Sequence, residues 1–192
     1  PLRGGSERQV KHWQETAAIL HQLSRLAERG RPAALATVVR ISGSAYRRPG
    51  ARLLVEEDGS SRGGVSGGCL EADVREVAQR VMQTGTPRLL HYDTGADDRT
   101  VWGLGLGCNG SGDIFVQPAT DGRTLISLKE LAARLRRTSS FAIATIVDGP
   151  SEVGTSAMYD AAPAARSHLD VDGSLTVFIE VLHPPPALII CG

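Results

Sequence analysis

Several features that mark other classes of protein are scarce or missing from this sequence of 192 residues. Aromatic residues make up only 4% of the chain against 41% hydrophobic residues, so we expect a core built mainly from Ala, Val, Leu and Ile. No apolar run reaches the roughly 18 residues that a membrane-spanning helix needs, so we expect no membrane span. Neither sign of charge is in excess, since 21 basic residues balance 21 acidic ones. That balance argues against a general nucleic-acid or membrane-surface partner.

The motifs of several common sites are missing as well. There is no Cys-x-x-Cys and no histidine pair of a zinc site, and no Gly-Lys-Ser/Thr of a P-loop. The five histidines show no ligand spacing. The N-terminus shows no signal-peptide pattern, and three cysteines, an odd number, do not make a disulfide framework. We therefore expect a cytoplasmic protein in a reducing compartment.

The hydrophobic periodicity predicts helices alternating with strands, which is typical of an α/β fold, with α+β as the other possibility. We expect a mixed sheet with flanking helices. Helices are predicted at 7–29, from about 69 to 83, and from Ser127, where Ser127-Leu128-Lys129-Glu130 matches a capping box. Strands are predicted at 33–41, 51–57, 88–92, 113–117, 141–147 and 176–182, with a hairpin around Asp172-Gly173.

The chain is predicted to form one domain over residues 7–183, in which 7–118 carry two glycine-rich loops and 119–183 support them. A faint internal repeat is present. Ala36-Thr37-Val38-Val39 followed by Asp58-Gly59 is similar to Ala144-Thr145-Ile146-Val147 followed by Asp172-Gly173. Either two similar helix–strand–hairpin units or chance would explain this similarity. If the repeat is real, the first unit holds the site and the second supports the structure.

The first glycine-rich loop runs from Arg62 to Glu71 and reads RGGVSGGCLE. Ser66, Gly67, Gly68 and Cys69 run into a predicted helix, where free N–H groups and the positive helix end suit an anion and favour a thiolate. Glu71 could use that positive end instead. An ordinary helix N-terminus with a small buried cysteine is the other interpretation of this loop.

The second glycine-rich loop, residues 102–110, reads WGLGLGCNG and leads to a strand, unlike a dinucleotide-binding loop. Its Cys108 follows Cys69 by 39 residues. Two thiols from separate loops could converge on a soft metal or on a sulfur carrier; two unrelated buried thiols would give the same pattern. We take Gly105, Gly107 and Cys108 as candidate cofactor contacts, and Cys69 with Cys108 as candidate metal ligands.

Arginines gather in the sequence before the first loop, at positions 47, 48, 52 and 62. An arginine side chain can hold a phosphate through two parallel hydrogen bonds. We take Arg47 and Arg48 as candidate contacts to an anionic cofactor, with solvated surface arginines as the alternative.

These segments resemble the XdhC/CoxI family of molybdenum-enzyme maturation factors. The resemblance rests on residues 36–51, on 63–71 and on 92–108, with the Ser-Gly-Gly-Cys and Gly-Leu-Gly-x-Gly-Cys segments in this order. It covers residues 33–118 closely and continues more loosely to the end of the chain.

The resemblance implies a homodimer that binds molybdenum cofactor, a pterin (molybdopterin) with a phosphate and a dithiolene that holds the metal. It implies help in sulfurating that metal, with a cysteine desulfurase as a partner, and delivery of the cofactor to an apo molybdenum hydroxylase of the xanthine dehydrogenase or carbon monoxide dehydrogenase type. It also implies a C-terminal Rossmann-like domain. A nucleotide could bind only in that domain. We expect residues 184–192 to be a proline linker and the first strand of that domain, with the remainder missing.

A maturation chaperone is therefore the leading hypothesis. The alternatives are an oxidoreductase and an accessory component of a dehydrogenase complex with no role in cofactor transfer. The sequence shows no complete nucleotide motif, no flavin or iron–sulfur ligand set and no ordered catalytic triad, so it favours a chaperone over an enzyme.

Overall fold

The computed structural model describes residues 3–43, 47–93, 110–120, 122–137 and 139–185. Its helices are α1 (Arg3–Glu28), α2 (Glu71–Thr84) and α3 (Gly122–Arg134). Its strands are β1 (Ala33–Gly43), β2 (Arg52–Glu56), β3 (Ser61–Gly63), β4 (Arg88–Asp93), β5 (Gly110–Pro118), β6 (Phe141–Asp148), β7 (Ser156–Asp160), β8 (His168–Asp172) and β9 (Leu175–Leu182). No helix in these ranges is long and apolar enough to cross a membrane.

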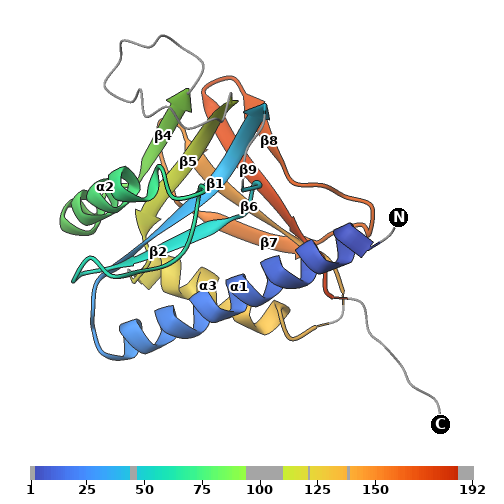
Figure 1. The fold of residues 1–192 in the computed structure, drawn as a ribbon, viewed down its shortest axis with the longest axis horizontal. Helices are drawn as coiled ribbons and strands as arrows, with labels where there is room; N and C mark the ends of the chain where they lie inside the picture. Colours follow the sequence, from blue (N-terminus) through green and yellow to red (C-terminus); the bar gives the residue numbers. More distant parts are fainter. Residues whose placement is uncertain (1–2, 44–46, 94–109, 121, 138, 186–192) are drawn as a thin grey trace.

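The strands form two sheets, with the orders β3-β2-β1-β5-β4 and β7-β6-β9-β8 (Figure 1). The predicted combination of helices and strands is confirmed. The single mixed sheet that we expected is instead two sheets, and every strand pair in the described residues is antiparallel. Neighbouring strands such as β8 and β9 are joined by tight turns, which force antiparallel pairing, whereas parallel pairing needs a long crossover.

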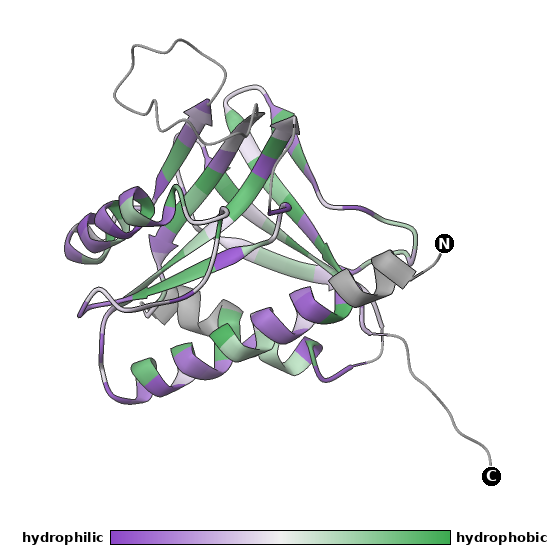
Figure 2. Cartoon of the chain, in the orientation of Figure 1, coloured by the Kyte–Doolittle hydropathy of each residue, from purple (hydrophilic) through white to green (hydrophobic). Residues whose placement is uncertain are grey.

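The helices pack on different faces of the five-stranded sheet. Helix α2 lies on the outer face, where it buries Val74, Ala78 and Val81 against strands β1, β2 and β5 (Figures 1 and 2). Helix α1 packs Ile19 and Leu23 against the opposite face and lies beside α3. Full burial of one such aliphatic side chain stabilises the fold by roughly 1.5–3 kcal/mol, so both faces of this sheet are held by apolar packing.

A separate apolar cluster joins the two sheets. Val39 and Phe115 come from the five-stranded sheet, Val147 and Phe178 come from the four-stranded one, and all four are nearly inaccessible to solvent. The second sheet therefore covers the inner face of the first together with α1 and α3 (Figure 1).

The sequence located most of these elements but missed two short strands. Strand β3 has three residues, all exposed, and β7 is an edge strand with a mostly exposed pattern, so neither shows an alternation that predicts a strand. The prediction that the third helix begins at Ser127 was wrong. Helix α3 begins at Gly122, so the capping-box sequence lies inside the helix.

The two sheets contain the same four-stranded unit. The first unit is β2-β1-β5-β4 and the second unit is β7-β6-β9-β8, in the order of the strands in each sheet. Strand β1 pairs Thr37 with Arg52 and with Phe115, and strand β6 pairs Thr145 with Ser156 and with Phe178 in the same arrangement. Both strands shift register shortly after that point, between Val38 and Arg40 in β1 and between Ile146 and Asp148 in β6.

The turns that follow also match. The backbone of Val38 exchanges hydrogen bonds with Gly50 and Ala51, and the backbone of Ile146 does the same with Gly154 and Thr155. The repeat of the strand that the sequence indicated is thus present in the structure. The two Asp-Gly turns are not equivalent, because Asp58-Gly59 joins β2 to β3 whereas Asp172-Gly173 joins β8 to β9.

The two units differ in what connects their strands. The first unit places β3, the first glycine-rich loop and α2 between β2 and β4, where the second unit runs from β7 directly to β8. Residues 94–109 connect β4 to β5, where the second unit has only the turn at Gly173-Ser174. Both glycine-rich loops are therefore insertions into the first unit.

Candidate functional site

The candidate site is built on the segment between β3 and α2, residues 64–70, which follows Gly63 at the end of β3. Gly63 has a φ of +92°, and a Cβ there would lie 2.2 Å from the carbonyl oxygen of Arg52. Gly68 has a φ of +120° and open space where its side chain would be. Glycine is required at both positions, for close backbone approach at Gly63 and for backbone conformation at Gly68.

The amide groups of this loop are occupied by a side chain of the protein itself. Oε1 of Glu71 accepts hydrogen bonds from the backbone N–H of Val65, at 3.2 Å, and of Ser66, at 2.9 Å. Its Oε2 accepts from the Ser66 hydroxyl. Oγ of Ser66 in turn accepts from the N–H groups of Gly68, at 3.0 Å, and Leu70, at 3.1 Å. Glu71 and Ser66 therefore form the inside of the turn.

The ionised form of Glu71 is favoured by these contacts. Partial burial acts to raise the pKa of its carboxyl group, but the hydrogen bonds from the Ser66 hydroxyl and from backbone N–H groups outweigh burial and hold the pKa below its ordinary value. The use of the loop amides by Glu71, which the sequence left open, is the arrangement observed. The contact of Ser66 with a cofactor stays a prediction; in the structure its hydroxyl is engaged with Glu71, Gly68 and Leu70.

Cys69 belongs to the same turn. It is a free, half-buried thiol next to Gly67 and Gly68, whose backbone is exposed. We predicted that the helix begins at about Cys69, but α2 begins at Glu71 with Leu70 as its N-cap residue, so the thiol precedes the helix. No group of three or more His, Cys, Asp or Glu side chains in the described parts of the chain could hold a bare metal ion.

The four arginines that gather in the sequence before the first loop occupy three different environments. Arg47 is half-buried and donates through Nη1 to both carboxylate oxygens of Glu15 on α1, at 3.1 and 3.3 Å. Its Nε is buried without a hydrogen-bond partner among the described residues. Arg48 and Arg62 are exposed, whereas Arg52 is buried in an ion pair with Glu180.

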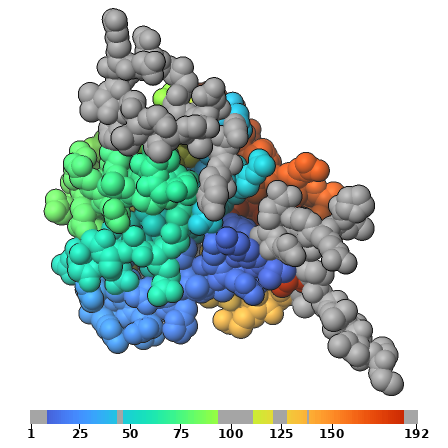
Figure 3. Space-filling view, viewed as in Figure 1, coloured from blue at the N-terminus to red at the C-terminus, as the bar shows by residue number. Residues whose placement is uncertain are grey.

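Gly64 places Arg47 beside the loop. A Cβ on Gly64 would lie 3.2 Å from Nη2 of Arg47 and 3.4 Å from Oε1 of Glu71, so both groups approach the same side of its backbone. The guanidinium of Arg47 and the carboxylate of Glu71 therefore flank the start of the loop. In the space-filling view, this part of the chain lies above α1 and next to α2 (Figure 3).

Residues 94–109, which include most of the second glycine-rich loop, connect the end of β4 to the start of β5. Gly43 pairs with Gly110 and Asp93 pairs with Ser111, so the ends of β1, β4 and β5 lie together. The hydroxyl of Tyr92 donates a hydrogen bond to Asp73 in the first turn of α2, which joins that end of β4 to the helix that follows Cys69. The predicted contacts at Gly105, Gly107 and Cys108 lie outside the described residues.

One polar cluster near this end was missed by sequence reasoning. The buried carboxylate of Asp113 accepts hydrogen bonds from Nε of Arg40, at 2.8 Å, and from His91, which lies opposite it on β4. These residues are far apart in the sequence and carry no shared motif. The only available signal was an acidic residue within an apolar strand.

Part of the chain, including the first glycine-rich loop, is similar to known proteins. Residues 26–93 match the model of the XdhC and CoxI family. Over 88 residues, the chain is 42% identical to a Bacillus subtilis protein named as a probable component of xanthine dehydrogenase. Over 67 residues, it is 43% identical to the molybdenum cofactor insertion chaperone PaoD of Escherichia coli. These alignments cover 46% and 35% of this chain, but only 27% and 21% of the two relatives.

The fold also matches a solved structure. A crystal structure from Bacillus halodurans, described as a xanthine dehydrogenase, is similar with a TM-score of 0.62 and 28% sequence identity. The match covers 86% of this chain and 53% of the other, so the chain spans about half the length of that structure.

Proposed function

We propose that the protein acts in the maturation of a molybdenum enzyme, because residues 26–93 match the model of the XdhC and CoxI family. It binds molybdenum cofactor and delivers it to an apo hydroxylase. The observation that carries the proposal is the thiol of Cys69 on an exposed glycine turn whose inner hydrogen bonds are already satisfied by Glu71 and Ser66.

The described residues fit a cofactor that brings its own metal ligands. They supply one accessible thiol and no cluster of three metal-ligating groups, so they do not fit a bare ion. Molybdenum cofactor supplies a metal already held by a dithiolene, to which sulfur can be added. The space at Gly68 is open, so a bulky ligand can approach the backbone next to Cys69. Soft thiolates suit such a metal centre.

Each residue of the site has a separate role in this proposal. Glu71 and Ser66 hold the turn, so the thiol of Cys69 is presented without rearrangement of the loop. The exposed backbone of Gly67 and Gly68 leaves room for the cofactor. Arg47 and Arg48 supply positive charge for its phosphate, Arg47 from a position fixed by Glu15. The amides of Val65 and Ser66 are not available to the phosphate while Glu71 accepts from them.

The finer steps follow from the family resemblance. Cys69 either contacts the metal or carries the sulfur that a cysteine desulfurase provides, and Cys108 is its proposed second thiol. The acceptor is a hydroxylase of the xanthine dehydrogenase or carbon monoxide dehydrogenase type. We propose that the protein works as a homodimer in the cytoplasm.

Cofactor loading and transfer test this proposal together. The protein is mixed anaerobically with molybdenum cofactor, separated from free cofactor, analysed for molybdenum and then added to an apo-hydroxylase. We expect retention of molybdenum and activation of the hydroxylase, both reduced by Cys69→Ser. Cys191→Ser is the matched control and should behave like the unchanged protein. Equal behaviour of the two variants would overturn the role of Cys69, and turnover of xanthine by the protein alone would favour the oxidoreductase alternative.

A further inference from the structure

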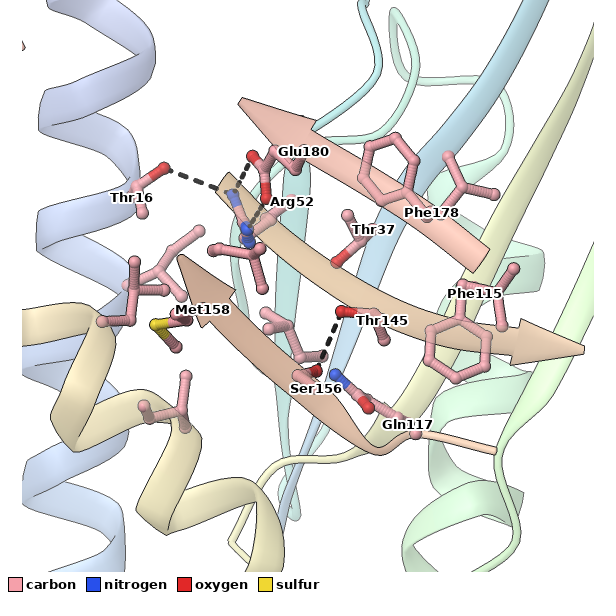
Figure 4. A pocket seen from close by; sticks show the side chains of 18 of the residues that line it. Thr16, Thr37, Arg52, Phe115, Gln117, Thr145, Ser156, Met158, Phe178 and Glu180 are labelled. Carbon is pink, nitrogen blue, oxygen red and sulfur yellow. Dashed lines mark hydrogen bonds and ion pairs between the residues drawn. The ribbon is translucent and has the colours of Figure 1, made fainter. Parts of the chain in front are cut away.

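A cavity lies between the two sheets, at the place where the two similar units face each other (Figure 4). It has a volume of about 60 Å³. Matched residues of the two units line it: Thr37 and Thr145, Phe115 and Phe178, and Val39 and Val147. Two further matched pairs differ in chemistry. Ser156 takes the place of Arg52, and Gln117 takes the place of Glu180.

On one side of the cavity, the long side chains meet. The guanidinium of Arg52 forms a bidentate ion pair with the carboxylate of Glu180. Its Nη1 donates to Oε1 at 3.0 Å and its Nη2 donates to Oε2. The same Nη1 donates to the carbonyl oxygen of Gly50 at 2.9 Å. Both side chains are almost fully buried. This ion pair fills the space between β2 and β9.

On the other side, no ion pair or hydrogen bond joins the equivalent side chains, Ser156 and Gln117. Ser156 is much shorter than arginine, and its hydroxyl lies 2.8 Å from that of Thr145. Oε1 of Gln117 is buried and has no hydrogen-bond partner among the described residues. The glycine turns beside the two pairs of residues are equivalent. A Cβ on Gly50 would meet Oε1 of Glu180, and a Cβ on Gly154 would meet Oε1 of Gln117.

From this comparison, we propose that the cavity is a hydrated internal site, in which ordered water occupies the position that a guanidinium group occupies in the other unit. A buried carbonyl oxygen without a donor is costly, and water is the donor that such a site usually receives. The volume exceeds the roughly 10–15 Å³ that one water molecule needs. Gln117, Thr37, Ser156 and Thr145 supply the two to four polar contacts that hold buried water.

Water fits this cavity better than a cation does. The nearest carboxylate, Glu180, is already paired with Arg52 and contacted by His12. Bringing a positive charge next to the neutral Gln117 would cost desolvation energy that no opposite charge offsets. The same argument predicts that a carboxylate at position 117 would make the cavity a site for a guanidinium group.

A crystal structure of the protein at a resolution that shows ordered water tests the first part. We expect at least one water within hydrogen-bond distance of the Gln117 side-chain amide and of a hydroxyl of Ser156, Thr145 or Thr37. An empty cavity would overturn the proposal, as would a different ligand in it.

A double-mutant cycle tests the second part. Gln117→Glu and Ser156→Arg should each lower the Tm, because each buries an unpaired charge. The double variant should have a higher Tm than either single variant, and its crystal structure should show the water displaced by an ion pair like that of Arg52 and Glu180. As a probe of the cavity, guanidinium chloride at low millimolar concentration should raise the Tm of Gln117→Glu but not that of the unchanged protein. A double variant less stable than both single variants would show that the two positions do not face one cavity, and would overturn the proposal.

Discussion

The two units of this protein share a strand framework but differ in what they add to it. The second unit joins its strands directly from β7 to β8 and by a tight turn from β8 to β9, while the first unit inserts α2 and both glycine-rich loops at the corresponding places. Every candidate cofactor contact lies in the first unit. The second unit thus has the strand framework alone, whereas the candidate site lies on segments added to the first unit, and loops are the parts of a fold that tolerate insertion.

The largest expected effect concerns the ion pair that only one side of the cavity has. Glu180→Gln should lower the free energy of unfolding by about 3–5 kcal/mol, because it leaves the buried guanidinium of Arg52 without its charge partner. Urea unfolding measures this loss. Asp170→Asn on the exposed face of β8 is the matched control and should change stability by less than about 0.5 kcal/mol. Similar losses in the two variants would contradict the role of the pair.

The same pair predicts a dependence on pH. Burial acts to raise the pKa of Glu180, but the charge of Arg52 and the contact with His12 outweigh it and lower the pKa to about 2 from an ordinary 4.5. A carboxyl group with a lowered pKa in the folded state stabilises the fold above its ordinary pKa and loses that contribution as the pH falls. Stability should therefore decline between about pH 4.5 and pH 2, and Glu180→Gln should reduce that decline. Parallel pH profiles for the two proteins would argue against it.

The equivalent turn glycines give the next comparison. Gly50 and Gly154 have φ values of +92° and +93°, so alanine at either position is strained by roughly 1–3 kcal/mol. The new Cβ would lie 2.6 Å from Oε1 of Glu180 in one case and 3.3 Å from Oε1 of Gln117 in the other. Gly50→Ala should therefore be the more destabilising variant in thermal unfolding. The reverse order would show that the two turns are not equivalent.

A smaller, local effect is expected in the inserted loop. Glu71→Ala removes the acceptor of the Val65 and Ser66 amides, at a cost of about 1–3 kcal/mol. Hydrogen exchange should show reduced protection of these two amides, and Cys69 should be alkylated at a different rate. Glu71→Gln, which keeps one acceptor oxygen, should lie between Glu71→Ala and the unchanged protein. Unchanged exchange at both amides in Glu71→Ala would mean that Glu71 does not hold the loop.

The smallest effect is expected beside the cavity in the second unit. Ser156→Ala removes one neutral hydrogen bond to Thr145 and should lower the free energy of unfolding by about 1 kcal/mol. Urea unfolding of this variant beside Glu180→Gln compares the neutral contact of Ser156 with the ion pair that its equivalent residue, Arg52, makes with Glu180. A loss as large as that of Glu180→Gln would mean that Ser156 has contacts beyond Thr145 and the proposed water.

The sequence predicted best what depends on local pattern. The buried strands β1 and β6 have apolar runs, α2 has an apolar face and is followed by Gly85 as its C-cap, and the first glycine-cysteine motif lies in the segment that matches the family model. Short exposed strands such as β7 carry no such pattern. The chemistry of the first loop was predicted only in outline, because whether Glu71 or a ligand takes the amides depends on where one side chain turns.

Contacts between distant residues could not be predicted from one sequence. Arg52 and Glu180 are separated by 128 residues and meet only because the two units face each other. The same holds for the cluster of Arg40, His91 and Asp113, which requires the order of β1, β5 and β4 in the sheet. The repeat in the sequence was visible at Ala36–Val39 and Ala144–Val147, but the matched positions that differ became visible only through strand register.

The hydrogen bond between Tyr92 and Asp73 has a consequence for the pH range in which the protein keeps its structure. Burial and the neighbouring carboxylate of Asp73 both raise the pKa of the Tyr92 phenol far above its ordinary value. The phenol therefore stays protonated at every pH at which cells operate. The link between the start of α2 and the end of β4, from which residues 94–109 continue, keeps its donor in both mildly acidic and mildly alkaline conditions.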